Sequence, residues 1–177
     1  MRDKFPYFGQ EITVTKSMCD QNGHMNVRYY SHIFDDASSE LYSDMGFTSD
    51  YLIQGYSVFT LEMNIKYLGE LREGEKASTF FRIVNVNPKL IHLGGVLITE
   101  DGELSCVNEQ ILAHVDMNAR KTSDMPVAMQ KNLYEIYENH KETGEIYNID
   151  VLETKPVECI KILNSNINVD FDTPLDG

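Results

Sequence analysis

The sequence predicts an α+β fold in which an antiparallel sheet carries one long helix across a face. Three observations predict it. Apolar residues recur at helical spacing soon after an early strand, several runs of alternating residues follow, and short turn sequences separate those runs. Consecutive strands with short connections pair antiparallel, and the apolar stripe of a helix is buried when it packs on such a sheet.

The chain begins with a strand and a long helix. Residues 8–15 alternate well enough to form the strand. Residues 27–44 form the predicted helix, which Gly46 ends because glycine suits the position just past a helix. The apolar residues at helical spacing are Tyr30, Ile33, Phe34, Ala37, Leu41 and Met45.

Residues 57–68 give the clearest strand pattern. Further strands are predicted at 76–86, 90–99 and 103–117, and short turns between all four predict a meander. Within the first of them the alternation predicts two faces. One face is predicted to carry Phe59, Leu61, Met63, Ile65 and Tyr67, and the other Thr60, Glu62, Asn64 and Lys66.

A last helix is predicted to open at Pro126, since proline is favoured at a helix start. Met129, Leu133, Ile136 and Tyr137 line one face of it. Residues 1–141 are therefore expected to form one domain. Residues 142–177 contain strand-like pieces interrupted by Pro, Asn and Asp, and we expect a C-terminal extension to which no role is assigned.

The charge of the chain limits its partners. Its 177 residues carry a formal net charge of −13, which argues against nucleic acid and against an anionic membrane surface. The first residues show no signal-peptide pattern, and no apolar run approaches the roughly 18 residues that a membrane span needs. Three distant cysteines without a CxxC motif are typical of reduced thiols, and a cytoplasmic location is expected.

Polar and reactive side chains crowd into residues 19–26, immediately before the long helix. A helix start offers unpaired N–H groups and a partial positive charge, which polarise a carbonyl oxygen and stabilise an oxyanion. Gly23 permits a tight turn and Asn26 can cap the helix. Asp20 can then serve as general base or nucleophile, so the arrangement fits attack on an acyl group.

The same loop residues also fit simpler roles. Asp, Asn and Gly before a helix are ordinary loop and capping residues, which is the more common case on spacing alone. Nothing local activates the thiol of Cys19 as a nucleophile. A metal site is conceivable but has no ligand pair at diagnostic spacing, so neither metal nor cofactor is expected. Its four candidate ligands are Asp20, His24, His92 and His114.

The loop Cys-Asp-Gln-Asn-Gly-His-Met-Asn (19–26), followed by Arg28-Tyr29-Tyr30, closely resembles the signature of hot-dog-fold acyl-CoA thioesterases of the 4-hydroxybenzoyl-CoA thioesterase type. Segments 59–71 and 109–121, with His92-Leu93, are similar to strands of one branch. That branch contains betainyl-CoA thioesterases and thioesterase domains fused to L-carnitine dehydrogenases. The resemblance spans about residues 8–137 and implies a hot-dog fold, an antiparallel sheet wrapped around a long central helix.

The resemblance also implies residue roles. Asp20 matches the base or nucleophile, and the polarising amide falls near Val27. His24 and Asn26 match positions that shape the loop and contact the acyl group. Glu62 matches a branch-typical acid that orients water or meets a cationic acyl group, unless it is simply a solvent-facing strand residue. His92 and Glu109 are weaker candidates, either of which is as readily explained as an exposed strand residue.

The function that the resemblance implies is hydrolysis of a small acyl-CoA to free acid and CoA, with CoA as part of the substrate. Betainyl-CoA is the favoured substrate, with a medium-chain or aromatic acyl-CoA, or an acyl carrier protein thioester, as the alternatives. Tyr29, Tyr30, Tyr56 or Tyr67 could offer a cationic acyl group a ring face. The expected assembly is a homodimer or dimer of dimers that joins two sheets. Two alternatives remain: a hydratase or dehydratase, which needs a histidine–acid pair in the pocket, and a non-catalytic acyl-CoA sensor, which usually needs an output module.

Overall fold

The computed structural model describes residues 2–144, so the extension predicted for residues 142–177 lies almost wholly outside them. Two short 3-10 helices, Arg2–Lys4 and Lys16–Met18, precede the main elements. The strands are β1 (Tyr7–Thr13), β2 (Tyr56–Tyr67), β3 (Lys76–Val86), β4 (Leu90–Thr99), β5 (Leu104–Asp116) and β6 (Lys121–Thr122). The helices are α1 (Val27–Ala37), α2 (Ser39–Asp44), α3 (Ser49–Ile53) and α4 (Val127–Lys141).

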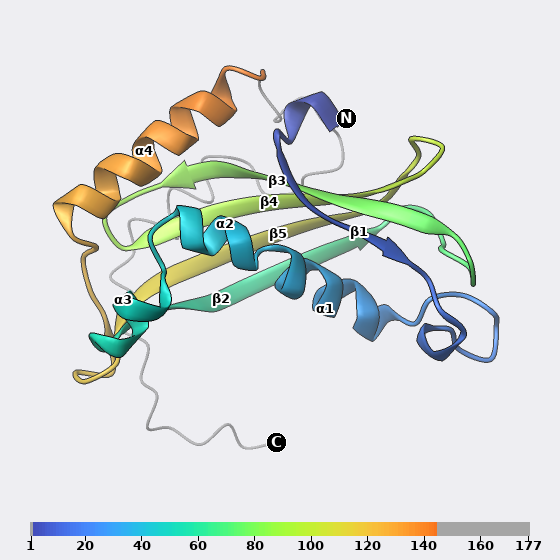
Figure 1. Cartoon of the computed structure of the whole chain (residues 1–177), viewed down its shortest axis with the longest axis horizontal. Helices are drawn as coiled ribbons and strands as arrows, with labels where there is room; N and C mark the ends of the chain where they lie inside the picture. The colour runs from blue at the N-terminus through green and yellow to red at the C-terminus, as the bar shows by residue number, and fades with distance from the viewer. Residues whose placement is uncertain (1, 145–177) are drawn as a thin grey trace.

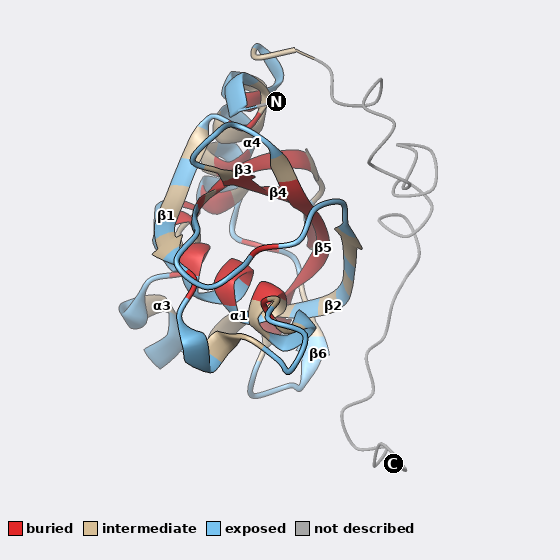
Figure 2. Cartoon of the chain, turned by 90° about the vertical axis from the view of Figure 1, so that its right-hand side faces the viewer, coloured by how far each residue is buried: buried red, intermediate tan, exposed pale blue. Residues whose placement is uncertain are grey.

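The strands form one antiparallel sheet in the order β1-β3-β4-β5-β2, with β6 paired to β5. The sheet curls around α1, so that β1 and β2 lie on opposite sides of the helix (Figures 1 and 2). The predicted α+β architecture, an antiparallel sheet wrapped around a helix, is confirmed.

The core lies between α1 and the concave face of the sheet. Tyr30, Ile33, Phe34 and Ala37 are the buried residues of α1, as the helical periodicity predicts. Alternate residues of the central strands meet them, and strand periodicity places these residues on one face. The largest fully buried side chains of this core are Phe34, Phe81, Leu41, Met45, Leu71, Ile83, Ile91, Leu93, Leu97, Leu112 and Met125.

The predicted four-strand meander is wrong in one respect. Strands β3, β4 and β5 follow one another, but β2 pairs with β5 and β1 takes the place beside β3. The segment between β2 and β3 must therefore cross from β2, at one edge of the curled sheet, to β3, which lies next to β1 at the other edge. It crosses beneath the start of α1, where Leu71 is fully buried and accepts a hydrogen bond from the Met25 amide at 2.7 Å. Burying Leu71 there gives the crossing a hydrophobic anchor.

The long helix predicted for residues 27–44 is divided in two at Ser38. The Ser38 amide donates to the Asp35 and Asp36 carbonyls, and its hydroxyl donates to the Asp35 carbonyl at 2.9 Å. Such bonding of a serine side chain back to the preceding turn bends helices. Gly46 follows α2 with φ of +107°, which confirms the predicted glycine stop.

A β-bulge in β2 contradicts the predicted alternation of its faces. The pairing with β5 runs from Thr60–Leu112 to Glu62–Ile111, which leaves Leu61 as an extra residue. Glu62 therefore shares the outer face of the sheet with Phe59, although they were predicted on opposite faces. Leu61 packs with Leu90, Ile111 and Ala113 on that outer face.

Helix α4 lies beside the part of β3 that has no pairing with β1. Strand β1 pairs with β3 only as far as Phe81. Beyond it, the Ile83 amide donates to Nδ1 of His140 in α4 at 2.9 Å. Pro126 lies immediately before α4, at the N-cap position and without a capping hydrogen bond, and Met129 and Leu133 are buried as predicted. At 15 residues α4 is the longest described helix, and none in residues 2–144 combines the length and apolar character needed to cross a membrane.

Candidate functional site

The loop before α1 is closed by its own backbone and by Asp20. The Asp20 amide donates to the His24 carbonyl and the Gly23 amide to the Asp20 carbonyl, both at 3.0 Å. One carboxylate oxygen of Asp20 accepts the Asn22 amide at 2.8 Å. Gly23 has φ of +80° and no atom near a would-be Cβ, so glycine suits the turn. The carboxylate is exposed and its orientation is fixed through one of its oxygens.

The start of α1 keeps an unpaired donor. Asn26 is the N-cap, and its side-chain oxygen accepts the Arg28 amide at 3.2 Å, as predicted. The Tyr29 amide donates to the Asn26 carbonyl. Within residues 2–144 the Val27 amide has no hydrogen-bond acceptor, and the Val27 side chain is 61% exposed. Such an N–H at the first helical position is available to a ligand oxygen.

The crossing segment between β2 and β3 forms the second wall of the site. His24 forms an isolated β-bridge with Arg72 of that segment. The Nε2 atom of His24 also lies 3.0 Å from a carboxylate oxygen of Glu70. Because both side chains are partly exposed, the pair adds little stability, but it places a histidine and an acid side by side.

A cavity of about 310 Å³ opens between the start of α1 and the end of β2. Its lining residues are His24, Met25, Val27, Tyr30, Tyr67, Leu68, Gly69 and Glu70. The rings of Tyr30 and Tyr67 pack edge to face with centroids 5.0 Å apart. Burial raises the pKa of both hydroxyls, so both stay neutral at physiological pH. The cavity thus joins an aromatic wall to the unpaired amide of Val27.

A buried thiol lies behind that aromatic wall. Cys106 is paired in register with Tyr67 and lies close to the Tyr30 hydroxyl. Burial raises the pKa of the Cys106 thiol to about 12, so it stays protonated and unreactive. Cys19, the other free cysteine of the described residues, donates weakly to the Thr15 carbonyl at 3.6 Å and does not line the cavity.

The structure brings only some of the predicted site residues together at the cavity. His24 and Val27 line the cavity, while Asp20 and Asn26 belong to the adjoining loop and helix cap. Glu62 is exposed on the outer face of the sheet, five residues before Tyr67, and the fold does not bring it to the loop of its own chain. Of the four tyrosines expected to offer a ring face, Tyr30 and Tyr67 meet in the cavity.

The weaker candidates lie elsewhere. His92 and Glu109 are not exposed but buried on the outer face, 3.2 Å apart. His114 accepts or donates a hydrogen bond with the Tyr51 hydroxyl at 2.7 Å and stacks on Tyr56, at the far end of β2. The four residues considered as metal ligands are thus dispersed, and no metal-binding group of three His, Cys, Asp or Glu occurs among the described residues.

Sequence reasoning missed Leu68, Gly69 and Glu70 as site residues. They lie on the crossing segment, whose path depends on which edge of the sheet β2 occupies. Nothing in their local pattern indicates a site. The one signal that could have found them is the length of that connection, eight residues from Leu68 to Glu75, which is long for a hairpin.

Comparisons with known proteins place the chain among thioesterases. Residues 14–133 match the family model described as the thioesterase-like superfamily. The chain is 31% identical over 142 residues to an L-carnitine dehydrogenase/betainyl-CoA thioesterase of Agrobacterium fabrum, covering 80% of this chain and 29% of that protein. It therefore spans less than a third of that relative. A betainyl-CoA thioesterase of Pseudomonas aeruginosa is 25% identical over 133 residues, covering 74% of this chain and 84% of that protein.

Solved structures agree with the fold. A hypothetical protein from Staphylococcus aureus in complex with CoA superposes with a TM-score of 0.75 at 28% identity, covering 84% of this chain and 92% of that one. A putative thioesterase from Pseudomonas putida gives a TM-score of 0.68 at 23% identity, covering 84% and 96% of the two chains. The curled sheet around α1 is therefore the hot-dog fold of these proteins.

Proposed function

Because the chain belongs to the thioesterase-like superfamily, we propose that it hydrolyses the thioester of a small acyl-CoA to the free acid and CoA. One observation carries the proposal: the unpaired Val27 amide opens into a cavity directly beside the loop that holds Asp20. Thioester hydrolysis needs a donor for the carbonyl oxygen and a group that supplies or activates the nucleophile. The relatives whose names specify betainyl-CoA thioesterase support the same chemistry.

In the proposed reaction, the thioester carbonyl oxygen accepts the Val27 N–H, aided by the positive end of α1. Water attacks the carbonyl carbon while the Asp20 carboxylate takes its proton. The C–S bond then breaks, and the proton passes to the CoA thiolate. In the second form of the mechanism, the Asp20 carboxylate attacks the carbonyl carbon, the C–S bond breaks and CoA leaves as the thiolate. Water then hydrolyses the resulting anhydride, which releases the acid and restores Asp20, and a proton from this water passes to the thiolate. In both forms the Asn22–Asp20 hydrogen bond orients the carboxylate.

The proposed assembly is a homodimer or a dimer of dimers. In the sheet formed by residues 2–144, β2 is an edge strand next to β5, and an edge strand offers backbone groups for pairing with another strand. Pairing with β2 of a second copy satisfies these groups and brings the second copy's chain to the cavity at the end of β2. Glu62 lies away from the loop of its own chain, so it could reach a site only through pairing with a second copy. There it remains a candidate to orient water or meet a cationic acyl group.

The favoured substrate is betainyl-CoA, whose acyl group carries a trimethylammonium cation. Tyr30 and Tyr67 line the cavity with aromatic surface, which attracts such cations. The net charge of −13 adds a favourable long-range field. We place the reaction in the cytoplasm, where the free thiols of Cys19 and Cys106 would stay reduced.

A hydratase or dehydratase is the second candidate, and a specific observation favours it. Such an enzyme needs a histidine paired with an acid in the pocket, and His24 and Glu70 form such a pair on the cavity wall. The pair can move a proton to or from a substrate carbon or hydroxyl. A non-catalytic acyl-CoA sensor gains no comparable support.

Incubation of the purified protein with a panel of acyl-CoAs tests the proposal. The panel contains betainyl-CoA, medium-chain and aromatic acyl-CoAs, and a 2-enoyl-CoA, with thiol release and enoyl absorbance followed in parallel. Thioester hydrolysis with release of free CoA is expected. Hydration of the enoyl-CoA without thiol release would establish the second candidate, and binding without turnover would establish a sensor.

A further inference from the structure

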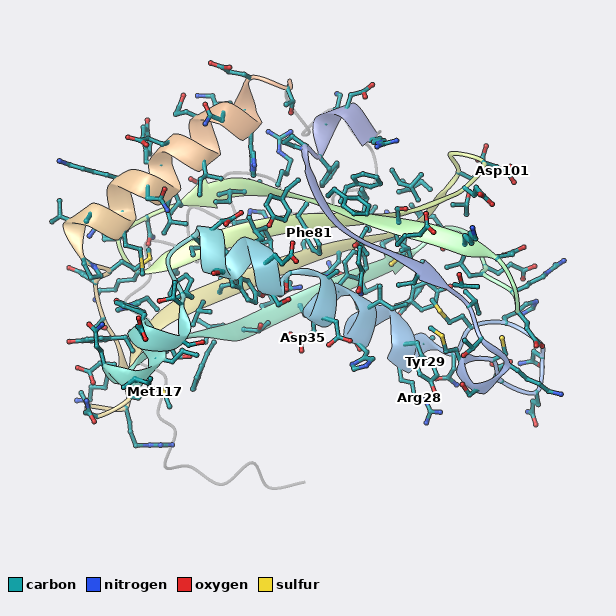
Figure 3. All side chains as sticks on the ribbon, in the orientation of Figure 1. Arg28, Tyr29, Asp35, Phe81, Asp101 and Met117 are labelled. Atoms are coloured by element: carbon teal, nitrogen blue, oxygen red, sulfur yellow. The ribbon has the colours of Figure 1, made fainter. Side chains whose placement is uncertain are left out.

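The sheet has a second apolar face, turned away from α1. Phe81 lies between β3 and α1, with its ring centroid 6.0 Å from that of Phe34 (Figure 3). Alternation along the strand therefore turns Phe80 and Arg82 to the opposite face, here called the outer face. The register of β3, β4 and β5 continues this face across the sheet. Its residues on β4 and β5 are Leu90, His92, Val96, Ile98, Val107, Glu109, Ile111 and Ala113.

All eight of these side chains are buried. Val96 is 0% exposed, Val107 2% and Ile111 4%. Figure 2 colours β4 and β5 as buried, while α1 packs only on their inner face. Side chains on one face of a single sheet have neighbours beside them but none above them. Burial this complete therefore requires a second layer over the outer face.

The residues of the described range supply only a small part of such a layer. The apolar side chains of the outer face form two clusters. In the first, Phe5 is the one member that does not come from a strand, and the second consists of strand residues alone. Helix α4 does not serve as the layer, because Met129 and Leu133 pack into the core around α1. Most of the outer face is thus buried by something beyond residues 2–144.

The described chain ends beside this face. Arg82 is buried on the outer side of β3. Its Nη1 atom donates to the Lys4 carbonyl at 2.9 Å and to the Gly144 carbonyl at 3.0 Å. Its Nη2 atom donates to the His140 carbonyl at 3.0 Å. These bonds fix the last described residue next to the outer face, and residues 145–177 continue from that point.

Residues 145–177 have the length and the pattern of apolar residues that the outer face requires. The 33 residues span up to about 110 Å when extended, whereas the 13 residues of β5 span about 43 Å. The segment can therefore run along the face and back. Within it, Ile167, Val169 and Phe171 alternate with Asn166, Asn168 and Asp170. In an extended chain this alternation places the apolar side chains on one side.

We propose that residues 145–177 dock on the outer face of their own chain, with Ile167, Val169 and Phe171 turned toward it. A second copy of the protein is the competing occupant. Attachment at Gly144 favours the chain's own segment, because a tether raises its effective concentration at the face. The docked segment keeps the apolar face away from other copies and leaves pairing between copies to the edge strand β2.

Two double variants of the full-length protein test the docking. Ile167→Asp/Val169→Asp places charges on the side proposed to meet the sheet. Asn166→Asp/Asn168→Asp makes the same change of charge on the other side and serves as the control. The first variant is expected to melt about 4 °C or more below the wild type, because two buried apolar side chains are lost. It should also bind more of the dye anilinonaphthalene sulfonate, which reports exposed apolar surface. The control should match the wild type in both measurements.

Trypsin measures the docking of the segment itself, because Lys161 lies within it. Cleavage follows the population in which the segment is released from the face. Cleavage at Lys161 should be at least about tenfold faster in Ile167→Asp/Val169→Asp than in the wild type or the control, since burying one such side chain is worth about that factor. Equal cleavage rates and equal melting temperatures for the two double variants would overturn the inference.

Cross-linking of the wild-type protein identifies the chain on which the segment docks. An amine-reactive cross-linker is expected to join Lys161 to Lys66, on the outer face of β2, or to Lys89, next to Leu90. The linked peptides should be recovered from the gel band that migrates as a single chain. Recovery only from the band of cross-linked dimers would place the segment on a second copy, and recovery from neither band would leave the face without it. Either result would overturn the inference.

Discussion

Asn26 caps α1 and also adjoins the unpaired Val27 amide, and two substitutions separate these roles. Asn26→Ala removes the cap and is expected to lower the free energy of unfolding by about 1 kcal/mol. Asn26→Asp keeps the cap, because a carboxylate oxygen accepts the same amide, and suits the positive helix end. It also places a negative charge beside the forming oxyanion, so turnover should fall about tenfold while stability is kept. Thermal unfolding and CoA release measure the two effects.

The control for this pair is Asn26→Ser, another good cap without charge, which should keep both stability and most of the turnover. Wild-type turnover in Asn26→Asp would contradict an oxyanion at the start of α1.

His140 makes the stability of the chain depend on pH. Burial lowers the pKa of its imidazole to about 4, with a smaller contribution from the charge of Arg82. The neutral ring accepts a hydrogen bond from the Ile83 amide at Nδ1. In the unfolded chain the imidazole becomes protonated near pH 6.5. Its contribution to the free energy of unfolding is therefore complete above that pH and is lost as the pH falls toward 4. The loss is about 3 kcal/mol at most.

His140→Asn retains an acceptor for Ile83 without the titration. Unfolding by denaturant at pH 7 and pH 4.5 should show a smaller pH dependence in the variant than in the wild type. Burial also lowers the pKa of His114, but that residue is common to both proteins and cancels in the comparison. Equal pH dependence in both would show that His140 does not carry the effect.

At the scale of elements, β1 approaches α1 closely at Gly9. A Cβ there would lie 2.5 Å from the Thr79 hydroxyl, 2.7 Å from the Phe81 ring and 3.0 Å from the Ala37 carbonyl. Gly9→Ala is therefore expected to cost about 1–3 kcal/mol, as overpacking in a core does. Gly69→Ala is the control, since its Cβ would find its nearest neighbour at an ordinary 3.6 Å. Similar unfolding midpoints for the two variants would contradict this packing of β1 on α1.

Much of the element order was predictable because alternation and helical spacing are local signals. The helix and strand boundaries agree to within a few residues, and Pro126 and Gly46 act as predicted. The bulge at Leu61 was not predictable, because a single extra residue leaves the local alternation looking regular. The break at Ser38 depends on one side chain bonding back to the previous turn.

The two walls of the site differ in how far they could be predicted. The loop and Val27 are contiguous with a helix start, and the sequence alone locates them. Leu68, Gly69 and Glu70 come to the site only because β2 and β3 occupy different parts of the sheet. The pairing of His24 with Glu70 therefore required the structure.

At the scale of the whole molecule, the position of β2 at the edge of the described sheet predicts self-association. Light scattering at micromolar concentration is expected to show a dimer or a dimer of dimers. Ile65→Pro, near the end of β2, should shift the equilibrium toward monomer, because the Leu68 amide faces β5 and the alternation of the strand then turns the Ile65 amide toward the edge, where proline removes that donor. A wild-type protein that is only monomeric would contradict pairing through β2.

The central claim is that Asp20 drives attack on a thioester held at the start of α1. Asp20→Asn preserves shape and an acceptor for the Asn22 amide but removes the charge. Since general-base assistance is worth about 10²–10⁴-fold, kcat for CoA release should fall at least a hundredfold, with melting temperature and the binding of an inert acyl-CoA analogue nearly unchanged. A variant that retains more than about a tenth of wild-type kcat, a smaller loss than removal of a general base causes, would contradict the claim.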